Sequence, residues 1–214
     1  MIDLSQTPQL DLWRGDFGRA YIQRNAITEE TIATRVRMWS RMLERALPEP
    51  RSILEVGANI GLNMHALSRM CTAELFAVEP NAVAREQLAT SGCMPVCNIS
   101  EGFAATVPHE DASRDLVFTS GVLIHIDPAH LEASCREIHR VSRRFILCSE
   151  YFSSEPREIR YRGLDGHLFL RDFGRFWLET CPDLCLIDYG FFWRGAGYAG
   201  DLTWWLFGKS AHAT

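Results

Sequence analysis

The 214-residue chain lacks the features that direct a protein to a membrane or across one. Residues 1–5 (MIDLS) have neither a basic stretch nor an apolar core, so they do not resemble a signal peptide. The longest apolar run lies near residues 204–207, far short of the roughly 18 residues that a membrane-spanning helix needs. We therefore expect a cytoplasmic protein without a membrane partner.

Clustered positive charge is also missing. The chain has 22 Lys and Arg against 27 Asp and Glu, a net charge of -5 at pH 7, and its longest basic run is the pair Arg143-Arg144. Proteins that bind nucleic acid concentrate positive charge against the phosphates. The sequence therefore favours a small-molecule substrate over nucleic acid, and it leaves the oligomeric state open.

The cysteines and the usual hydrolase motifs offer no further chemistry. Seven cysteines, an odd number in a chain without a secretion signal, argue against a disulfide framework. Cys93 with Cys97, and Cys181 with Cys185, have a spacing that can bind zinc, but their flanking residues are typical of a core, so we predict no metal. G-x-S-x-G, Walker A and H-E-x-x-H motifs are absent, which leaves hydrolysis and phosphoryl transfer unsupported.

What the sequence does contain is an alternation of apolar strands with helices. We expect strands at residues 52–56, 74–78, 94–97, 115–119, 144–149, 184–189 and 203–207. We expect helices between them at residues 62–70, 82–89, 128–139 and 172–179. This order predicts an α/β fold with a mostly parallel seven-stranded sheet and an antiparallel C-terminal strand pair.

The N-terminal residues follow a helical pattern instead. Trp13, Phe17 and Tyr21 recur at four-residue steps, as on one face of a short helix. Thr28 caps a second predicted helix, which runs through Arg45. We expect residues 1–47 to form a helical cap on a domain of residues 48–214, with the two making one compact unit.

The most informative motif is E-V-G-A-N-I-G, residues 55–61, at the end of the first predicted strand. Gly57 and Gly61 let the backbone approach a ligand closely, and Asn59 adds an amide contact. A dinucleotide turn would require glycine where Glu55 stands, and a carboxylate there disfavours a pyrophosphate. Glu55 instead suits a ligand with ammonium and sulfonium charges, such as S-adenosylmethionine (SAM).

A second acid strengthens this interpretation. Glu79 ends the second predicted strand, 18 residues after Gly61, and Pro80 follows it. A carboxylate at that strand end accepts hydrogen bonds from both hydroxyls of a ribose. Together the two motifs favour a SAM site over a plain glycine turn and a capping acid.

The two motifs and the strand order resemble the class I SAM-dependent methyltransferases over residues 50–150. This resemblance implies a Rossmann-like fold with SAM as cosubstrate. It places Ser100 and Glu101 near the adenine, where relatives carry an aspartate, and Ser120 beneath the methionine part. The N-terminal aromatic face fits either the core or a helix folded over the SAM site, and the resemblance favours the second. The expected cofactor contacts from that helix are Trp13, Tyr21, Arg24 and Asn25.

Segments near both ends resemble a narrower group. They are WRGDFG at residues 13–18, SGVLIHI at 120–126, YRG at 161–163, RDF at 171–173 and DLTW at 201–204. They are similar to methylases associated with pseudaminic-acid biosynthesis, a group that includes enzymes cyclising SAM to azetidine-2-carboxylate. Asp127 departs from the asparagine expected there.

Three side chains are candidates for catalysis because they follow predicted strands at their carboxyl ends, where ligands bind. Histidine titrates near neutral pH, so His125 suits a general base, although it equally fits a structural role. Asp127 could instead serve only as the N-cap of the helix that begins at Pro128, and Tyr151 could instead be an aromatic side chain that covers the core.

The predicted activity is methyl transfer from SAM to a small polar molecule, such as a sugar or a sugar nucleotide. One alternative is a SAM-consuming cyclase (lyase) that forms azetidine-2-carboxylate and methylthioadenosine. The aromatic residues of 189–205 could form the cage that this reaction needs, or they could be ordinary core. Another alternative is a non-catalytic SAM-binding module.

Overall fold

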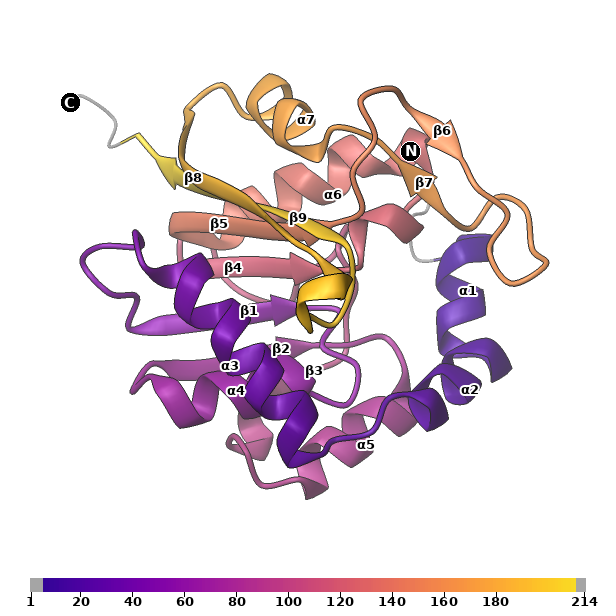
Figure 1. Cartoon of the computed structure of the whole chain (residues 1–214), viewed down its shortest axis with the longest axis horizontal. Helices are drawn as coiled ribbons and strands as arrows, with labels where there is room; N and C mark the ends of the chain where they lie inside the picture. The colour runs from indigo at the N-terminus through magenta and orange to yellow at the C-terminus, as the bar shows by residue number, and fades with distance from the viewer. Residues whose placement is uncertain (1–5, 211–214) are drawn as a thin grey trace.

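A seven-stranded sheet organises the protein in the computed structural model, which describes residues 6–210 (Figure 1). Its strand order is β3-β2-β1-β4-β5-β9-β8. The first five strands are parallel, and β9 runs antiparallel to both of its neighbours. The bounds are β1 Ser52–Val56, β2 Glu74–Val78, β3 Ile99–Ser100, β4 Arg114–Ser120, β5 Ser142–Glu150, β8 Leu184–Phe192 and β9 Leu202–Lys209. The predicted α/β fold and its antiparallel C-terminal pair are confirmed.

Helices cover both faces of the sheet, because buried residues alternate along the strands. In β1, Ile53 joins the cluster on one face, whereas Leu54 and Val56 join the other. The first face is covered by α3 (Glu29–Leu43), α4 (Leu62–Met70) and α5 (Ala82–Thr90), and the second by α6 (Pro128–Val141) and α7 (Phe173–Thr180). The parallel strands are therefore buried on both sides.

The N-terminal segment forms two helices where one was predicted. They are α1 (Pro8–Arg14) and α2 (Asp16–Arg24), separated by Gly15 in an extended conformation. Both lie beyond the carboxyl ends of β1 and β4 (Figure 1). The helix expected after Thr28 is confirmed as α3, since the Thr28 hydroxyl accepts from the backbone of Thr31.

One local prediction was wrong, and two short strands were missed. The strand expected at residues 94–97 is a short 3-10 turn over Val96–Asn98, and pairing begins only at Ile99. The side-chain amide of the buried Asn98 donates to the carbonyl of Leu75 at 3.0 Å. This bond holds residue 98 beside β2, and strand pairing with β2 starts at the next residue, Ile99. The sequence also did not predict the two-stranded β6 (Arg157–Glu158) and β7 (Phe169–Leu170), which are too short to show a period.

Candidate functional site

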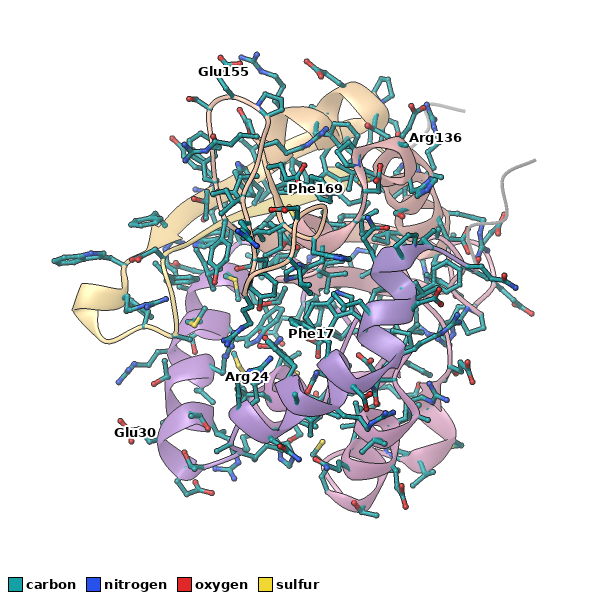
Figure 2. All side chains as sticks on the ribbon, turned by 90° about the vertical axis from the view of Figure 1, so that its right-hand side faces the viewer. Phe17, Arg24, Glu30, Arg136, Glu155 and Phe169 are labelled. Atoms are coloured by element: carbon teal, nitrogen blue, oxygen red, sulfur yellow. The ribbon has the colours of Figure 1, made fainter. Side chains whose placement is uncertain are left out.

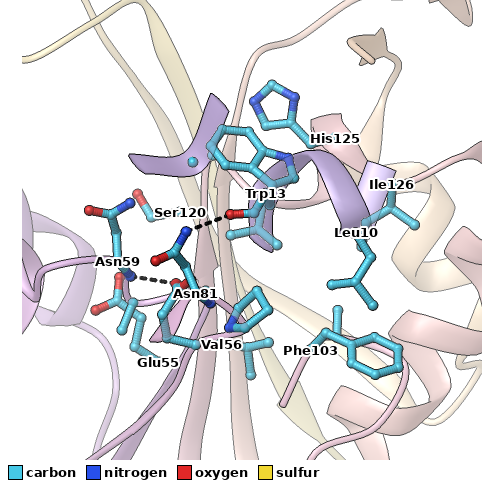
Figure 3. Close-up of a pocket in the computed structure, with 18 of the residues that line it drawn as sticks. Leu10, Trp13, Glu55, Val56, Asn59, Asn81, Phe103, Ser120, His125 and Ile126 are labelled. Atoms are coloured by element: carbon cyan, nitrogen blue, oxygen red, sulfur yellow. Dashed lines mark hydrogen bonds between the residues drawn. The ribbon is translucent and has the colours of Figure 1, made fainter. Parts of the chain in front are cut away.

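A cavity lies at the carboxyl ends of β1, β2 and β4, between these strands and α1–α2 (Figure 3). Ligands of open α/β sheets bind at this edge. The structure brings most of the predicted site residues together in its lining. They are Trp13, Tyr21, Asn25, Glu55, Gly57, Asn59, Glu79, Pro80, Ser120, His125 and Asp127.

Five predicted residues lie outside this lining, and Arg24 is one of them. Gly61 begins α4 in a left-handed conformation, with φ of 84°, and a side chain there would collide with Leu88. Ser100 ends β3, and the exposed Glu101 pairs with Arg85 at 2.9 Å. Tyr151, which follows β5, packs against both core clusters.

The glycine turn is tied to the second strand by its main chain. The amides of Gly57 and Ala58 donate to the carbonyl of Val78 at 2.7 and 3.2 Å. Gly57 has φ of 82°, and a Cβ there would lie 2.5 Å from Cγ2 of Val122. Only glycine fits this position without strain, so the backbone is exposed to the cavity.

Glu79 holds the turn from the other side. Its two carboxylate oxygens accept from the amides of Asn81 at 2.8 Å and Asn59 at 2.7 Å (Figure 3). Each oxygen keeps a second acceptor position, which a ribose hydroxyl can use. Burial raises the pKa of Glu79 to about 7. The Asn81 side chain also donates to the Trp13 carbonyl at 2.8 Å, which joins α1 to the floor of the cavity.

Two ionisable side chains in the cavity have buried atoms without partners. Glu55 accepts from the Asn63 amide at 2.6 Å through Oε1, but its Oε2 is buried without a hydrogen bond. Nε of Arg35, on α3, is buried and unpartnered in the same way. Burial raises the pKa of Glu55 to about 8 and lowers that of Arg35. Among residues 6–210 no ion pair joins the two side chains.

Sequence reasoning missed Arg35, although a signal for it exists. The buried residues Ile32 and Trp39 lie three positions before it and four after it, so Arg35 interrupts the apolar stripe of α3. A charge inside such a stripe needs a buried partner or a ligand. Arg24, the predicted donor on α2, does not line the cavity and instead lies 5.6 and 5.5 Å from the ring centres of Phe17 and Tyr21 (Figure 2).

Aromatic rings close the cavity. Trp13 contacts Tyr21 with ring centres 5.2 Å apart and His125 at 4.8 Å, and His125 in turn lies 5.0 Å from Tyr161. These four residues form what we call the aromatic lid, which joins α1 and α2 to the segment between β6 and β7. The side chain of Gln9 donates to the Gly166 carbonyl at 2.9 Å and fixes the same contact.

The environment of His125 makes it a weak base. Its Nδ1 lies 2.6 Å from the His167 carbonyl, so Nδ1 carries the hydrogen and Nε2 the lone pair. Burial lowers the pKa of His125 to about 4, so the ring is neutral near pH 7. Asp127 caps α6 by accepting from the amide of Ala129 at 2.8 Å, and it also lines the cavity.

Glu150 is a further buried acid beside Glu55 and Glu79, and the sequence did not reveal it as important. Its Oε1 accepts from the Thr119 hydroxyl and from the amides of Val122 and Leu123 at 3.1 to 3.2 Å. These bonds hold the loop that carries His125. Burial raises the pKa of Glu150 to about 7.

Within residues 6–210 no group of three or more His, Cys, Asp or Glu side chains is arranged to hold a metal ion. Over the same span, no helix combines the length and the apolar character needed to cross a membrane. The cysteines are all free thiols.

Residues 53–144 match a family model described as a methyltransferase domain. A search of curated protein sequences finds no significant match. Solved structures, however, resemble almost the whole chain, which has the class I methyltransferase fold.

Three of these structures illustrate the likeness. Burkholderia thailandensis 1,6-didemethyltoxoflavin-N1-methyltransferase, solved with S-adenosylhomocysteine, has a TM-score of 0.68 at 16% identity, covering 98% of this chain and 94% of its own. Magnesium protoporphyrin IX methyltransferase from Synechocystis, solved with SAM, has a TM-score of 0.69 at 9% identity, covering 98% and 100%. A SAM-dependent methyltransferase from Leishmania major has a TM-score of 0.70 at 15% identity, covering 95% and 87%. At these identities the likeness establishes the fold.

Proposed function

We propose that this protein binds SAM and transfers its methyl group to a small polar acceptor. The observation that carries the proposal is the pair of unpartnered groups in the cavity, Oε2 of Glu55 and Nε of Arg35. A ligand that carries both an ammonium and a carboxylate, as the methionine end of SAM does, satisfies both. A nicotinamide dinucleotide carries a pyrophosphate instead and leaves Glu55 facing negative charge.

The rest of the cavity suits the nucleoside. The free acceptor positions of Glu79 suit the two ribose hydroxyls, and Gly57 leaves the main chain accessible. Phe103 lines the cavity and offers a ring for the adenine. Ser100 and Glu101 remain proposed adenine contacts, since the Ser100 carbonyl accepts from the amide of Glu79 at 3.1 Å. The match of residues 53–144 and the ligands of the similar structures support SAM as cosubstrate.

When bound, SAM supplies a methyl group already activated on a sulfonium, so the protein mainly has to orient the acceptor and exclude water. The aromatic lid does both, and its ring faces stabilise the positive charge. His125 presents the Nε2 lone pair, but its low pKa suits positioning better than proton removal. Asp127, with one oxygen in the α6 cap, is the stronger candidate for taking a proton from an acceptor. Tyr151 is proposed to orient the acceptor.

Several broader expectations stand as parts of the proposal. Residues 1–47 act as a cap on a SAM-binding domain of residues 48–214, consistent with the bond from Asn81 to Trp13. A sugar or sugar nucleotide is the proposed acceptor class, and the proposed location is the cytoplasm.

Cyclisation of SAM is the second candidate, favoured by the closed aromatic lid and by the narrower sequence resemblance. The amino nitrogen attacks the γ-carbon of the same molecule, and the bond from that carbon to sulfur breaks. Methylthioadenosine leaves, the nitrogen loses a proton, and azetidine-2-carboxylate remains. This reaction needs no acceptor site, only a bent chain and a dry enclosure.

Mass spectrometry of SAM incubated with the protein distinguishes these functions. We expect SAM to stay intact alone and to become S-adenosylhomocysteine when sugars, sugar nucleotides or amino acids are added. Methylthioadenosine with a four-carbon amino acid, formed without acceptor, assigns the cyclase instead. SAM that binds but is never consumed assigns a binding module, and absence of binding refutes all three. Gly57→Val, in which a side chain blocks the turn, is the negative control.

A further inference from the structure

The outer edge of the sheet at β8 has no strand beside it among the described residues (Figure 1). β8 spans nine residues, LCLIDYGFF, and contains neither proline nor lysine. Natural proteins place such residues, or a covering element, on long edge strands because free main-chain groups recruit other strands. A bulge near Ile187, between Leu186 and Asp188, is the only irregularity in its pairing with β9. From Asp188 to Phe192 the strand pairs regularly with β9, and within this segment the amide of Tyr189 donates to Oδ1 of Asp188 at 2.9 Å.

Large apolar side chains gather on one face of this edge. Tyr189 is 62% exposed and Phe191 is 59% exposed, and they share a groove with Phe152, which is 48% exposed. Leu186, on the same face of β8, is 44% exposed, and Trp193, just beyond the strand, is 61% exposed. We call these five residues the β8 patch.

The side chains on the opposite face of β8 make their contacts within the same chain. Phe192 is buried there, and Asp188 pairs with Arg41 of α3 at 2.9 Å. The charge nearest the centre of the edge is therefore held in an ion pair, in which Arg41 also contacts Glu44 at 2.9 Å. Although the chain carries a net charge of -5, this edge does not concentrate it.

The area of the patch matches a specific interface. At about 200 Å² for each large side chain, the exposed fractions give roughly 550 Å² of apolar surface on one chain. Isolated exposed apolar residues are ordinary, but a patch of this size is typical of an interaction surface. Two such patches together bury about 1,100 Å², above the roughly 1,000 Å² that a specific protein interface should exceed.

We propose that β8 pairs antiparallel with β8 of a second copy of this chain, about a two-fold axis near Gly190. An antiparallel strand is its own complement, so both copies use the same surface and their sheets become continuous. With the axis at Gly190, Tyr189 lies opposite Phe191 of the second copy on the same face. Aromatic cross-strand pairs of this kind stabilise sheets, and the glycine lets the two strands approach. This inference does not depend on the proposed function.

Sedimentation equilibrium over a range of concentrations tests the association. We expect a mass of twice the chain mass of 24.3 kDa. Phe191→Lys should weaken dimerisation by about tenfold or more, the effect of losing an aromatic side chain at an interface centre. Val96→Lys is the matched control, because Val96 is 62% exposed beside β3, at the far edge of the sheet. A monomer at all concentrations, or equal weakening by both variants, overturns the proposal.

Cross-linking tests which surface is used, even if Phe191→Lys fails to fold. The single-cysteine probes are introduced into a parent protein that carries Cys97→Ser and Cys185→Ser, which remove the two exposed thiols. We expect a short bifunctional maleimide to join two copies of the Tyr189→Cys variant. The parent and the Val96→Cys variant should remain single chains. A dimer that cross-links at residue 96 as well as at residue 189 overturns the proposed geometry.

Discussion

Ligand binding should release a proton from Glu55. In the unliganded protein this carboxyl is buried, one oxygen has no partner, and burial raises its pKa to about 8. An ammonium placed against it favours the ionised form. Ligand binding at neutral pH therefore drives the proton off, and replacing Glu55 by glutamine should abolish this release.

The size of the effect follows from the pKa values. With a pKa of about 8, Glu55 holds about 0.9 proton at pH 7 before binding. The amino group of the ligand lies beside its own carboxylate and titrates well above pH 7, so it is already charged and takes up almost no proton. Glu79, with a pKa of about 7, can add to the release. Wild type and Glu55→Gln share the last two contributions, so their difference should be about 0.9 proton.

Calorimetric titration with S-adenosylhomocysteine measures this difference, because that ligand has the same amino-acid end and cannot be consumed. Titrations at pH 7 in buffers with different ionisation enthalpies give the number of protons released. Glu132→Gln is the control, since its carboxylate is exposed, pairs with Arg136 and lies outside the cavity lining. Equal release by wild type and Glu55→Gln would refute an ammonium contact at Glu55.

Three further outcomes test other parts of the site. Gly57→Val should abolish S-adenosylhomocysteine binding, since φ there is 82° and a Cβ would lie 2.5 Å from Val122; calorimetry showing wild-type affinity contradicts this. Glu79→Ala should weaken the same binding by about 1–3 kcal/mol, the loss of charge-assisted hydrogen bonds, and unchanged affinity would remove Glu79 from the site. The pKa of Glu150 is about 7 in the folded protein and about 4.5 in the unfolded chain. Between these pH values the folded protein therefore binds one more proton than the unfolded chain, and the free energy of unfolding falls as the pH rises. Denaturant unfolding measured from pH 4.5 to 8 should show that this decrease in stability is about 3 kcal/mol smaller in Glu150→Gln than in wild type. The same pH dependence in both proteins would argue against a raised pKa of Glu150.

The sequence predicted the centre of the fold well because buried parallel strands leave an unambiguous pattern. Continuous apolar runs identified β1, β2 and β4. The same logic failed at β3, where only two residues pair. Gly15 divided the first helix, and four-residue spacing alone does not reveal such a break.

In the candidate site, residues close to the glycine turn in sequence were predictable and distant ones were not. Glu55 and Gly57 follow from the strand-to-turn order, and Glu79 from its distance to that turn. Arg35 reaches the cavity only because α3 packs beside α4, a contact between segments that β1 separates in the sequence. The partners of Glu150 likewise come from β4 and the loop after it.

Recognition of an amino-acid end by Arg35 and Glu55 is the central claim, and comparing two ligands tests it most directly. Methylthioadenosine has the nucleoside of S-adenosylhomocysteine but lacks the charged end. Since each charge-assisted contact contributes about tenfold or more, wild type should prefer S-adenosylhomocysteine by at least about 100-fold. In Arg35→Met this preference should fall by at least about tenfold. Equal affinities for the two ligands in wild type, or an unchanged preference in Arg35→Met, would contradict the account.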